Sequence, residues 1–163
     1  MLNQSAFSMI ASGGFNPAML QTTETIQSRF GEISVDLSRA VHFPRGLLGM
    51  PNKTNFVLAN FNSAKMEQFV LLQSLDEIPL SFITLPIDYS NSIIAPADLR
   101  GAAQDLQIAD DDLLVLLLVS VHRRPDKVQL SVNSRAPLII DVKQKFGMQF
   151  VFQNDAYKVQ HML

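Results

Sequence analysis

The 163-residue chain contains no cysteine, and this absence excludes several kinds of chemistry at once. No residue is available to form a disulfide, to hold an iron–sulfur cluster or a thiolate zinc site, or to act as a cysteine nucleophile. A chain without cysteine is compatible with the cytoplasm, which is the location that we expect.

The chain also lacks a large charge imbalance and a long apolar run. Its net charge is −2 and its pI is about 5.8, whereas proteins that bind a phosphate backbone usually display a basic patch. The longest apolar run, residues 113–119, is too short for a membrane-spanning helix, which needs about 20 residues. Its composition predicts a strand buried on both faces. We therefore expect neither a nucleic acid nor a membrane as a direct partner.

The residues that are present predict one folded domain with an extension. The composition is 47% hydrophobic and 17% charged, enough for a core in a chain of this length. Residues 1–21 contain no lysine or arginine, and Gly13, Gly14 and Pro17 interrupt the apolar core that a secretion signal would need. We predict that residues 1–21 are mostly disordered and that residues 22–163 form a single domain.

Most of the domain has the two-residue periodicity of strands. The clearest case is "KVQLSVN", which places Val128, Leu130 and Val132 on one face. By the same reasoning we expect strands at 24–30, 32–36, 40–43, 56–61, 68–74, 79–86, 113–122, 127–133, 136–142 and 148–153.

One segment has helical spacing instead. Within residues 96–113, Leu99, Ala102, Ala103 and Leu106 recur at intervals of three and four, which predicts one short helix or a pair of helical turns. About ten short strands with one such insertion indicate a mainly β, single-domain antiparallel barrel-like fold, or a sandwich, with one or two short helices.

Two neighbouring carboxylates, Asp76 and Glu77, lie within "LLQSLDEIPLSFITLP". Adjacent residues of a strand point to opposite faces, whereas a catalytic carboxylate pair normally comes from separate parts of the chain. Pro79 follows closely, and turn chemistry explains the stretch more simply. We interpret it as a hairpin connection between strands 68–74 and 79–86.

No other pattern indicates catalysis or a cofactor. His42, His122 and His161 are isolated, with no metal-ligand spacing. The three aspartates at 110–112 lack the ligand alternation and glycine of an EF-hand loop and are typical of a solvated cap. We expect no metal and no cofactor.

The segment 43–52, "FPRGLLGMPN", is unusual because it is apolar for a loop. Leu47, Leu48 and Met50 stand between its glycines and prolines. They could plug one end of the barrel, or they could form an exposed apolar surface that binds a partner. Both interpretations could hold for different residues of this loop.

Four stretches, in this order along the chain, resemble the FliW family of flagellar assembly factors. The family's F-P-x-G-L-x-G-F segment resembles the 43–52 loop, its L-Q-S-x-D hairpin is similar to the stretch around Asp76, and its N-x-x-A-P-I-x-I-N ending resembles "NSRAPLIID". Met50 and Pro51 depart from the family, which usually has Phe-Glu there. The similar stretches are 28–35, 41–58, 69–86 and 132–163.

The resemblance implies a non-enzymatic regulator that works through protein partners. Such proteins bind the translational repressor CsrA and keep it from flagellin messenger RNA, and they also bind flagellin. When flagellin accumulates it captures the factor and frees CsrA. For this chain we hypothesise that Leu47, Leu48 and Met50 form an apolar anchor for a partner, with Asp76 and Glu77 as a charged rim.

Two alternatives remain open. A small barrel that binds RNA or another ligand would need exposed aromatic residues beside a basic rim, and only Phe150 and Phe152 in "MQFVFQ" are candidates. An enzyme would need His42, His122 or His161 to meet a carboxylate in a pocket.

Overall fold

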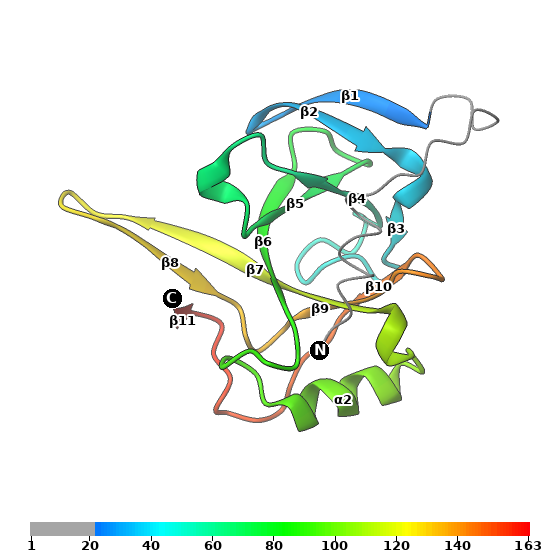
Figure 1. The fold of residues 1–163 in the computed structure, drawn as a ribbon, viewed down its shortest axis with the longest axis vertical. Coiled ribbons are helices and arrows are strands. Elements are labelled where there is room, and N and C mark those ends of the chain that lie inside the picture. Colours follow the sequence, from blue (N-terminus) through cyan, green and yellow to red (C-terminus); the bar gives the residue numbers. More distant parts are fainter. Residues whose placement is uncertain (1–21) are drawn as a thin grey trace.

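Eleven strands and one α-helix form the described part of the chain in the computed structural model, which covers residues 22–163 (Figure 1). The predicted disorder of residues 1–21 lies outside these residues. The strands are β1 (Thr23–Ser28), β2 (Gly31–Asp36), β3 (Val41–His42), β4 (Asn55–Asn60), β5 (Val70–Ser74), β6 (Ser81–Ile87), β7 (Leu113–Arg123), β8 (Val128–Val132), β9 (Leu138–Asp141), β10 (Phe146–Gln149) and β11 (His161–Met162). The helix is α2 (Pro96–Asp105), and 3-10 turns occur at Leu37–Arg39, Ala64–Met66 and Asp110–Asp112.

Seven of the strands close into a barrel. The order β7-β6-β5-β4-β3-β10-β9 returns to its start because β9 also pairs with β7. Every pairing in this ring is antiparallel except that of β10 with β3. The predicted fold class, mainly β and barrel-like with short helical segments, is therefore confirmed.

The barrel interior is filled with large apolar side chains. Alternate residues of each strand point inward, and those that meet inside are fully buried. The central members of this cluster are Phe43, Phe56, Leu72, Leu116 and Leu138. Burying a side chain of this size contributes roughly 1.5–3 kcal/mol, so the interior provides much of the driving force for folding.

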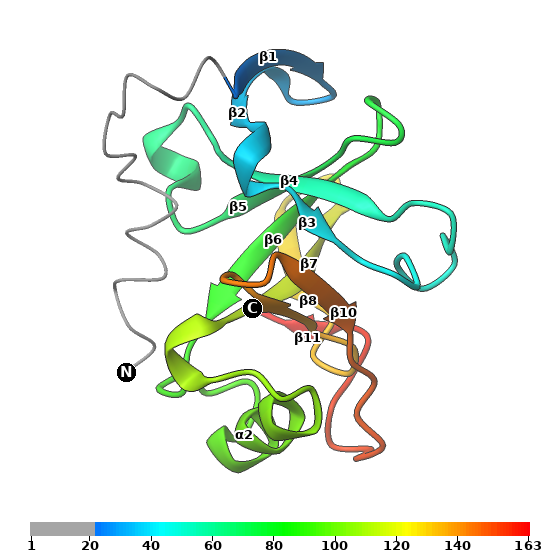
Figure 2. The same ribbon diagram turned by 90° about the vertical axis from the view of Figure 1, so that its right-hand side faces the viewer.

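Two separate covers protect the outside of the barrel, one at each end of the views in Figures 1 and 2. The hairpin β1–β2 places Ile33 and Val35 against Val57 and Leu71 of β4 and β5.

The second cover is α2 and the C-terminal segment. Leu99 and Ala102, as their helical spacing predicted, pack with Val115 and Ile139 of the barrel. Tyr157 ties the C-terminal segment to the helix: its hydroxyl donates to Asp98 and accepts from the backbone N–H of Ala95 at 3.1 Å. None of the helices in residues 22–163 has the length and apolar character needed to span a membrane.

Strand β7 belongs to two structures at once. Its first half, Leu113–Leu117, is buried in the barrel, where the predicted burial on both faces is correct. Its second half leaves the barrel and pairs with β8, so that the two strands form an arm that projects from the body (Figure 1). Here the predicted burial on both faces was wrong, because Leu118 and Val119, the last residues of the apolar run, are only half-buried, and Val121 beyond them is 40% exposed. Along β8, exposure likewise falls from 64% at Val128 to 0% at Val132.

The expected strand 148–153 was also wrong, since β10 ends at Gln149. Its pairing with β9 stops at the pair Gln149–Leu138. The residue before Leu138 is Pro137, which has no N–H with which to continue the ladder. The chain beyond follows an irregular path, in which Phe150 donates its backbone N–H to the carbonyl of Pro137 at 2.9 Å.

Gly147 of β10 offers a test of how tightly the interior is packed. A Cβ added there would lie 2.5 Å from the ring of Phe43. Gly147→Ala should therefore lower the free energy of unfolding by about 1–3 kcal/mol, measured by urea unfolding. Gly101→Ala is the matched control, because Gly101 lies within α2 with nothing within 4 Å. It should raise stability by about 0.5–1 kcal/mol. Equal effects of the two changes would contradict the packing described.

Candidate functional site

The 43–52 loop closes one end of the barrel with its inner residues. Phe43 and Leu47 are 0% and 2% exposed and pack in the interior cluster. The loop can fold this tightly because Gly46 adopts a φ of +62°, which favours glycine. A Cβ at Gly46 would lie only 2.3 Å from the carbonyl oxygen of Met50.

The same loop also presents apolar side chains outward. Leu48 is 59% exposed, and Met50 is half-buried beside the interior cluster. The backbone N–H of Leu48 donates to Oε1 of Gln149 at 2.8 Å, and Nε2 of Gln149 donates to the carbonyl of Ala136 at 3.1 Å. The loop therefore has an inside and an outside, with Leu47 on the first and Leu48 on the second.

Asp76 and Glu77 lie in the turn between β5 and β6, as predicted. The turn is fixed from within, because Nε2 of the buried Gln73 donates to the carbonyl of Ile78 at 2.7 Å. Glu77 donates its backbone N–H to the hydroxyl of Ser74 at 3.0 Å. Each carboxylate therefore leaves the turn in a defined direction.

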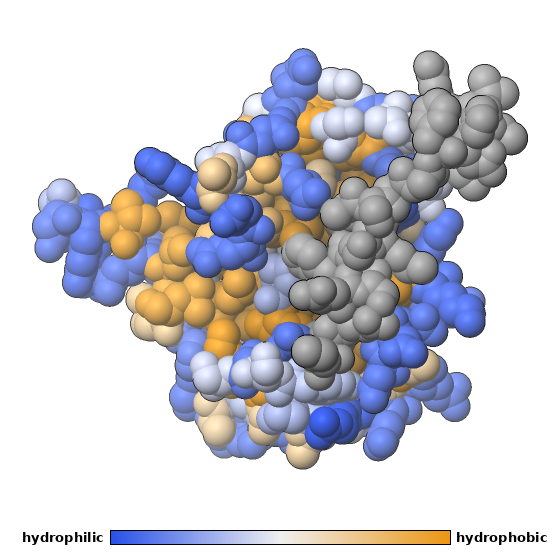
Figure 3. All heavy atoms as spheres, in the orientation of Figure 1, coloured by the Kyte–Doolittle hydropathy of each residue, from blue (hydrophilic) through white to orange (hydrophobic). Residues whose placement is uncertain are grey.

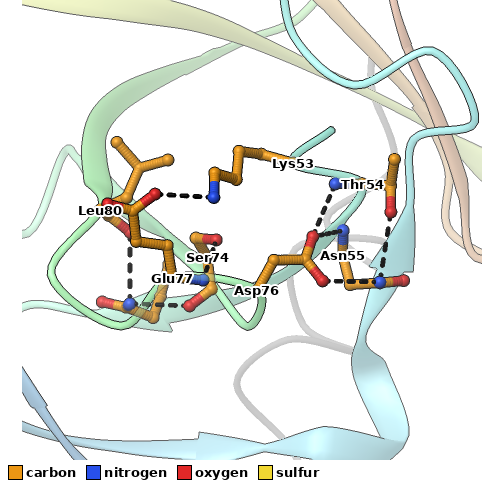
Figure 4. A network of polar contacts seen from close by, with 8 residues as sticks. Lys53, Thr54, Asn55, Ser74, Asp76, Glu77 and Leu80 are labelled. Carbon is orange, nitrogen blue, oxygen red and sulfur yellow. Dashed lines mark hydrogen bonds and ion pairs between the residues drawn. The ribbon is translucent and has the colours of Figure 1, made fainter. Parts of the chain in front are cut away.

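The carboxylate of Asp76 binds Thr54 and Asn55, which follow just after the 43–52 loop, to this turn (Figure 4). Its Oδ2 accepts the backbone N–H groups of Thr54 at 2.6 Å and Asn55 at 2.9 Å, and its Oδ1 accepts from the Asn55 side chain at 3.0 Å. We call these three hydrogen bonds the Asp76 clamp. Beside it, Nζ of Lys53 lies 2.8 Å from Oε2 of Glu77.

The clamp changes the protonation behaviour of Asp76. The hydrogen bond from the Asn55 side chain, then those from the backbone of Asn55 and Thr54, and the charge of Lys53 hold the pKa of Asp76 below its ordinary value, against a smaller opposing effect of burial. Each of these interactions favours the ionised form. Of the two carboxylates, Asp76 thus positions the loop, whereas Glu77, 50% exposed in its side chain, lies at the rim.

The histidines and the acidic run have polar partners of other kinds. Nδ1 of His42 lies 3.1 Å from Oδ1 of Asn55, and Nε2 of His122 lies 2.7 Å from the hydroxyl of Ser131. Asp110 accepts from Tyr89 at 2.6 Å, and burial together with this bond raises the pKa of Tyr89 to about 12. Residues 22–163 contain no cluster of His, Asp or Glu able to hold a metal ion.

The aromatic residues of "MQFVFQ" do not form an exposed row. Phe152 is 7% exposed and packs with Phe150, the two ring centroids lying 5.2 Å apart, and with Tyr157. The candidate surface for the RNA-binding alternative is therefore turned largely into the core beside α2.

Sequence reasoning missed the residues that fix the loop, namely Lys53, Thr54, Asn55 and Gln149. A run of polar residues after an apolar loop, "NKTN", was the available signal. Their partners are more than twenty positions away in the sequence, and a pattern in one chain does not identify such a partner.

A family model described as "FliW protein" matches residues 24–163, which is most of the chain. The chain belongs to the FliW family.

Several curated relatives share the match. The chain is 30% identical over 135 residues to the flagellar assembly factor FliW of Clostridium botulinum (strain Langeland), covering 82% of this chain and 91% of that protein. It is 33% identical over 129 residues to the FliW of Desulfovibrio desulfuricans, covering 76% and 75%. A crystal structure of the flagellar assembly factor FliW has the same fold, with a TM-score of 0.65 and 24% identity, over 86% of this chain and 95% of the other.

The Asp76 clamp predicts a specific loss of stability in acid. The pKa of Asp76 is lower in the folded protein than its ordinary value of 3.8. The stabilisation is therefore fully present above that value and is lost as the pH falls through the lowered pKa. Asp76→Asn should destabilise the protein at neutral pH, and its difference in melting temperature from the original protein should shrink as the pH drops below 3.8.

Asp126→Asn is the matched control. It removes the same charge from an exposed turn of the arm, between β7 and β8. A melting-temperature difference for Asp76→Asn that stays constant down to strongly acidic pH would contradict the clamp.

Proposed function

We propose that this FliW-family chain is a cytoplasmic, non-enzymatic flagellar assembly factor that binds flagellin and sequesters the translational repressor CsrA. The observation that carries the proposal is the family match over residues 24–163. It is supported by relatives that bear the name flagellar assembly factor and align over most of this chain.

The proposed role is a switch between two protein partners. While flagellin is scarce the protein holds CsrA, and when flagellin accumulates it takes the place of CsrA. Such a switch requires a coupling free energy, and linkage makes it reciprocal: each partner must weaken the binding of the other by the same factor. A coupling of about 3 kcal/mol would change the affinity by over a hundredfold.

The surface that we propose for partner binding is the 43–52 loop. Leu48 supplies an exposed apolar anchor and Met50 a half-buried one, while Leu47 supports the loop from inside. The Asp76 clamp fixes the loop before a partner arrives, which reduces the entropy lost on binding. Glu77 and Lys53 supply charges at the rim, where they favour orientation and specificity over raw affinity.

The mild acidity of the chain supports a protein partner over RNA. A net charge of −2 is better suited to attracting a basic RNA-binding protein than to contacting phosphates. CsrA, whose ligand is RNA, is expected to be such a protein.

Calorimetry with the purified flagellin and CsrA of the same organism tests the proposal and the surface together. The original protein should bind both, and the double variant Leu48→Ser, Met50→Ser should bind at least one of them about tenfold more weakly or worse, because it loses the apolar anchor. Binding to neither partner by the original protein would overturn the proposed function.

Val159→Ser is the matched control, because Val159 is 62% exposed, similar to Leu48, but lies in the C-terminal segment. It should leave both affinities unchanged. Partner affinities that survive in a folded Leu48→Ser, Met50→Ser variant would place the partner surface elsewhere.

A further inference from the structure

Strands β6 and β7 separate where the arm leaves the barrel. Their pairing ends at Thr84 and Leu118. Beyond that point, residues 119–123 of β7 pair with β8 alone, and residues 81–83 of β6 pair with β5 alone. Each strand thus keeps one edge with which no strand of residues 22–163 pairs, and the two edges face the same groove.

The direction of the backbone groups follows from the neighbouring hydrogen bonds. Asn133 donates its N–H to the carbonyl of Leu118 at 2.9 Å, so Leu118 points its polar groups toward the β8 side. Because this direction alternates along a strand, Val121 and Arg123 point their N–H and C=O groups to the open edge. Leu80, the residue just before β6, accepts from the backbone N–H of Ser74 in β5, so the next residue, Ser81, points its backbone groups toward the groove.

The groove between these edges has a volume of about 510 Å³ and a mixed lining, in which arginine and serine residues accompany apolar side chains. Phe82 and Ile83 contribute from β6, Val119 and Val121 from β7, and Phe30 from the β1–β2 turn. Val121 is 40% and Phe30 is 38% exposed. Figure 3 shows apolar surface along the arm, continuing from it onto the body.

Two further features of the groove indicate the chemistry of its occupant. Arg29 and Arg123 line it, and no acidic residue does. The guanidinium of Arg29 lies 4.7 Å from the ring centroid of Phe30, in a cation–π contact. Ser81 also lines the groove, and its hydroxyl is buried without a hydrogen-bond partner in the described residues, with the residue 1% exposed. Such orphaned groups are rare and costly.

We propose that an extended segment of a protein partner, with apolar side chains at alternate positions and an acidic residue near Arg29 and Arg123, docks in this groove by adding a strand to the edge of β7. Strand addition satisfies the backbone groups of Val121 and Arg123, while the groove selects side chains on one face. The acidic residue pairs with the two arginines, which have no carboxylate beside them in the groove.

A second copy of this chain fits the groove less well. Two copies meeting through the same edge would bring their arms together, each carrying Arg123, Arg124 and Lys127, and like charges across an interface oppose association. The proposal concerns a surface distinct from the 43–52 loop and depends on neither flagellin nor CsrA.

Selection of short random peptides displayed on phage, with the full-length protein as bait, tests the proposal. The enriched peptides should alternate apolar residues, contain an acidic residue and lack proline. Their affinity, measured by fluorescence anisotropy, should fall about tenfold or more in Val121→Pro and in Arg123→Glu. Proline at Val121 removes an N–H that faces the groove and not β8, so the arm itself should survive. Lys127→Glu makes the same charge change outside the groove and should have no effect.

Two readouts complete the test. Hydrogen exchange should show the amides of Val121 and Arg123 protected when peptide is bound, and Arg123→Glu should recover affinity for peptides whose acidic residue is replaced by lysine. Failure to enrich any peptide, or enriched peptides that bind both variants as well as the original protein, would overturn the proposal. A concentration-dependent dimer in sedimentation that Val121→Pro abolishes would also overturn it, since a second copy would then fill the groove.

Discussion

The hydrogen bonds to one carboxylate, that of Asp76, help to determine how this barrel presents the apolar 43–52 loop. Two backbone N–H groups and one side-chain amide converge on it, and together they join Thr54 and Asn55, just after the 43–52 loop, to the β5–β6 turn. Hydrogen bonds to an ionised group are roughly twice as strong as neutral ones. With Phe43 and Leu47 anchored in the barrel, the outer side of the loop, including Leu48, is held in one orientation.

The sequence predicted those parts of the fold that depend on local periodicity. The β5–β6 turn, helix α2 and most strands follow from alternation and from helical spacing. The end of β10 at Gln149 was missed because it depends on Pro137, which directly precedes the partner strand β9, and the incomplete burial of Leu118 and Val119 was missed because β7 leaves the barrel midway. The periodicity of the residues along one strand indicates neither of these features.

The candidate site was likewise predictable only in those features that depend on the local sequence. That the 43–52 loop is apolar was evident, but which leucine faces inward depends on the backbone reversal at Gly46, where φ is positive. The clamp was not predictable, because the backbone amides that Asp76 accepts from, those of Thr54 and Asn55, lie more than twenty positions before Asp76 in the sequence. The resemblance to the FliW family, by contrast, rested on motif order, and the family match confirmed it.

If the chain acts as the proposed switch, the binding of either partner must weaken the binding of the other. Calorimetric titration of CsrA into the protein, with and without saturating flagellin, tests it most directly. Flagellin should raise the dissociation constant of CsrA by about a hundredfold, and CsrA should raise the dissociation constant of flagellin by the same factor. Unchanged affinities and a stable ternary complex of the three proteins would contradict it.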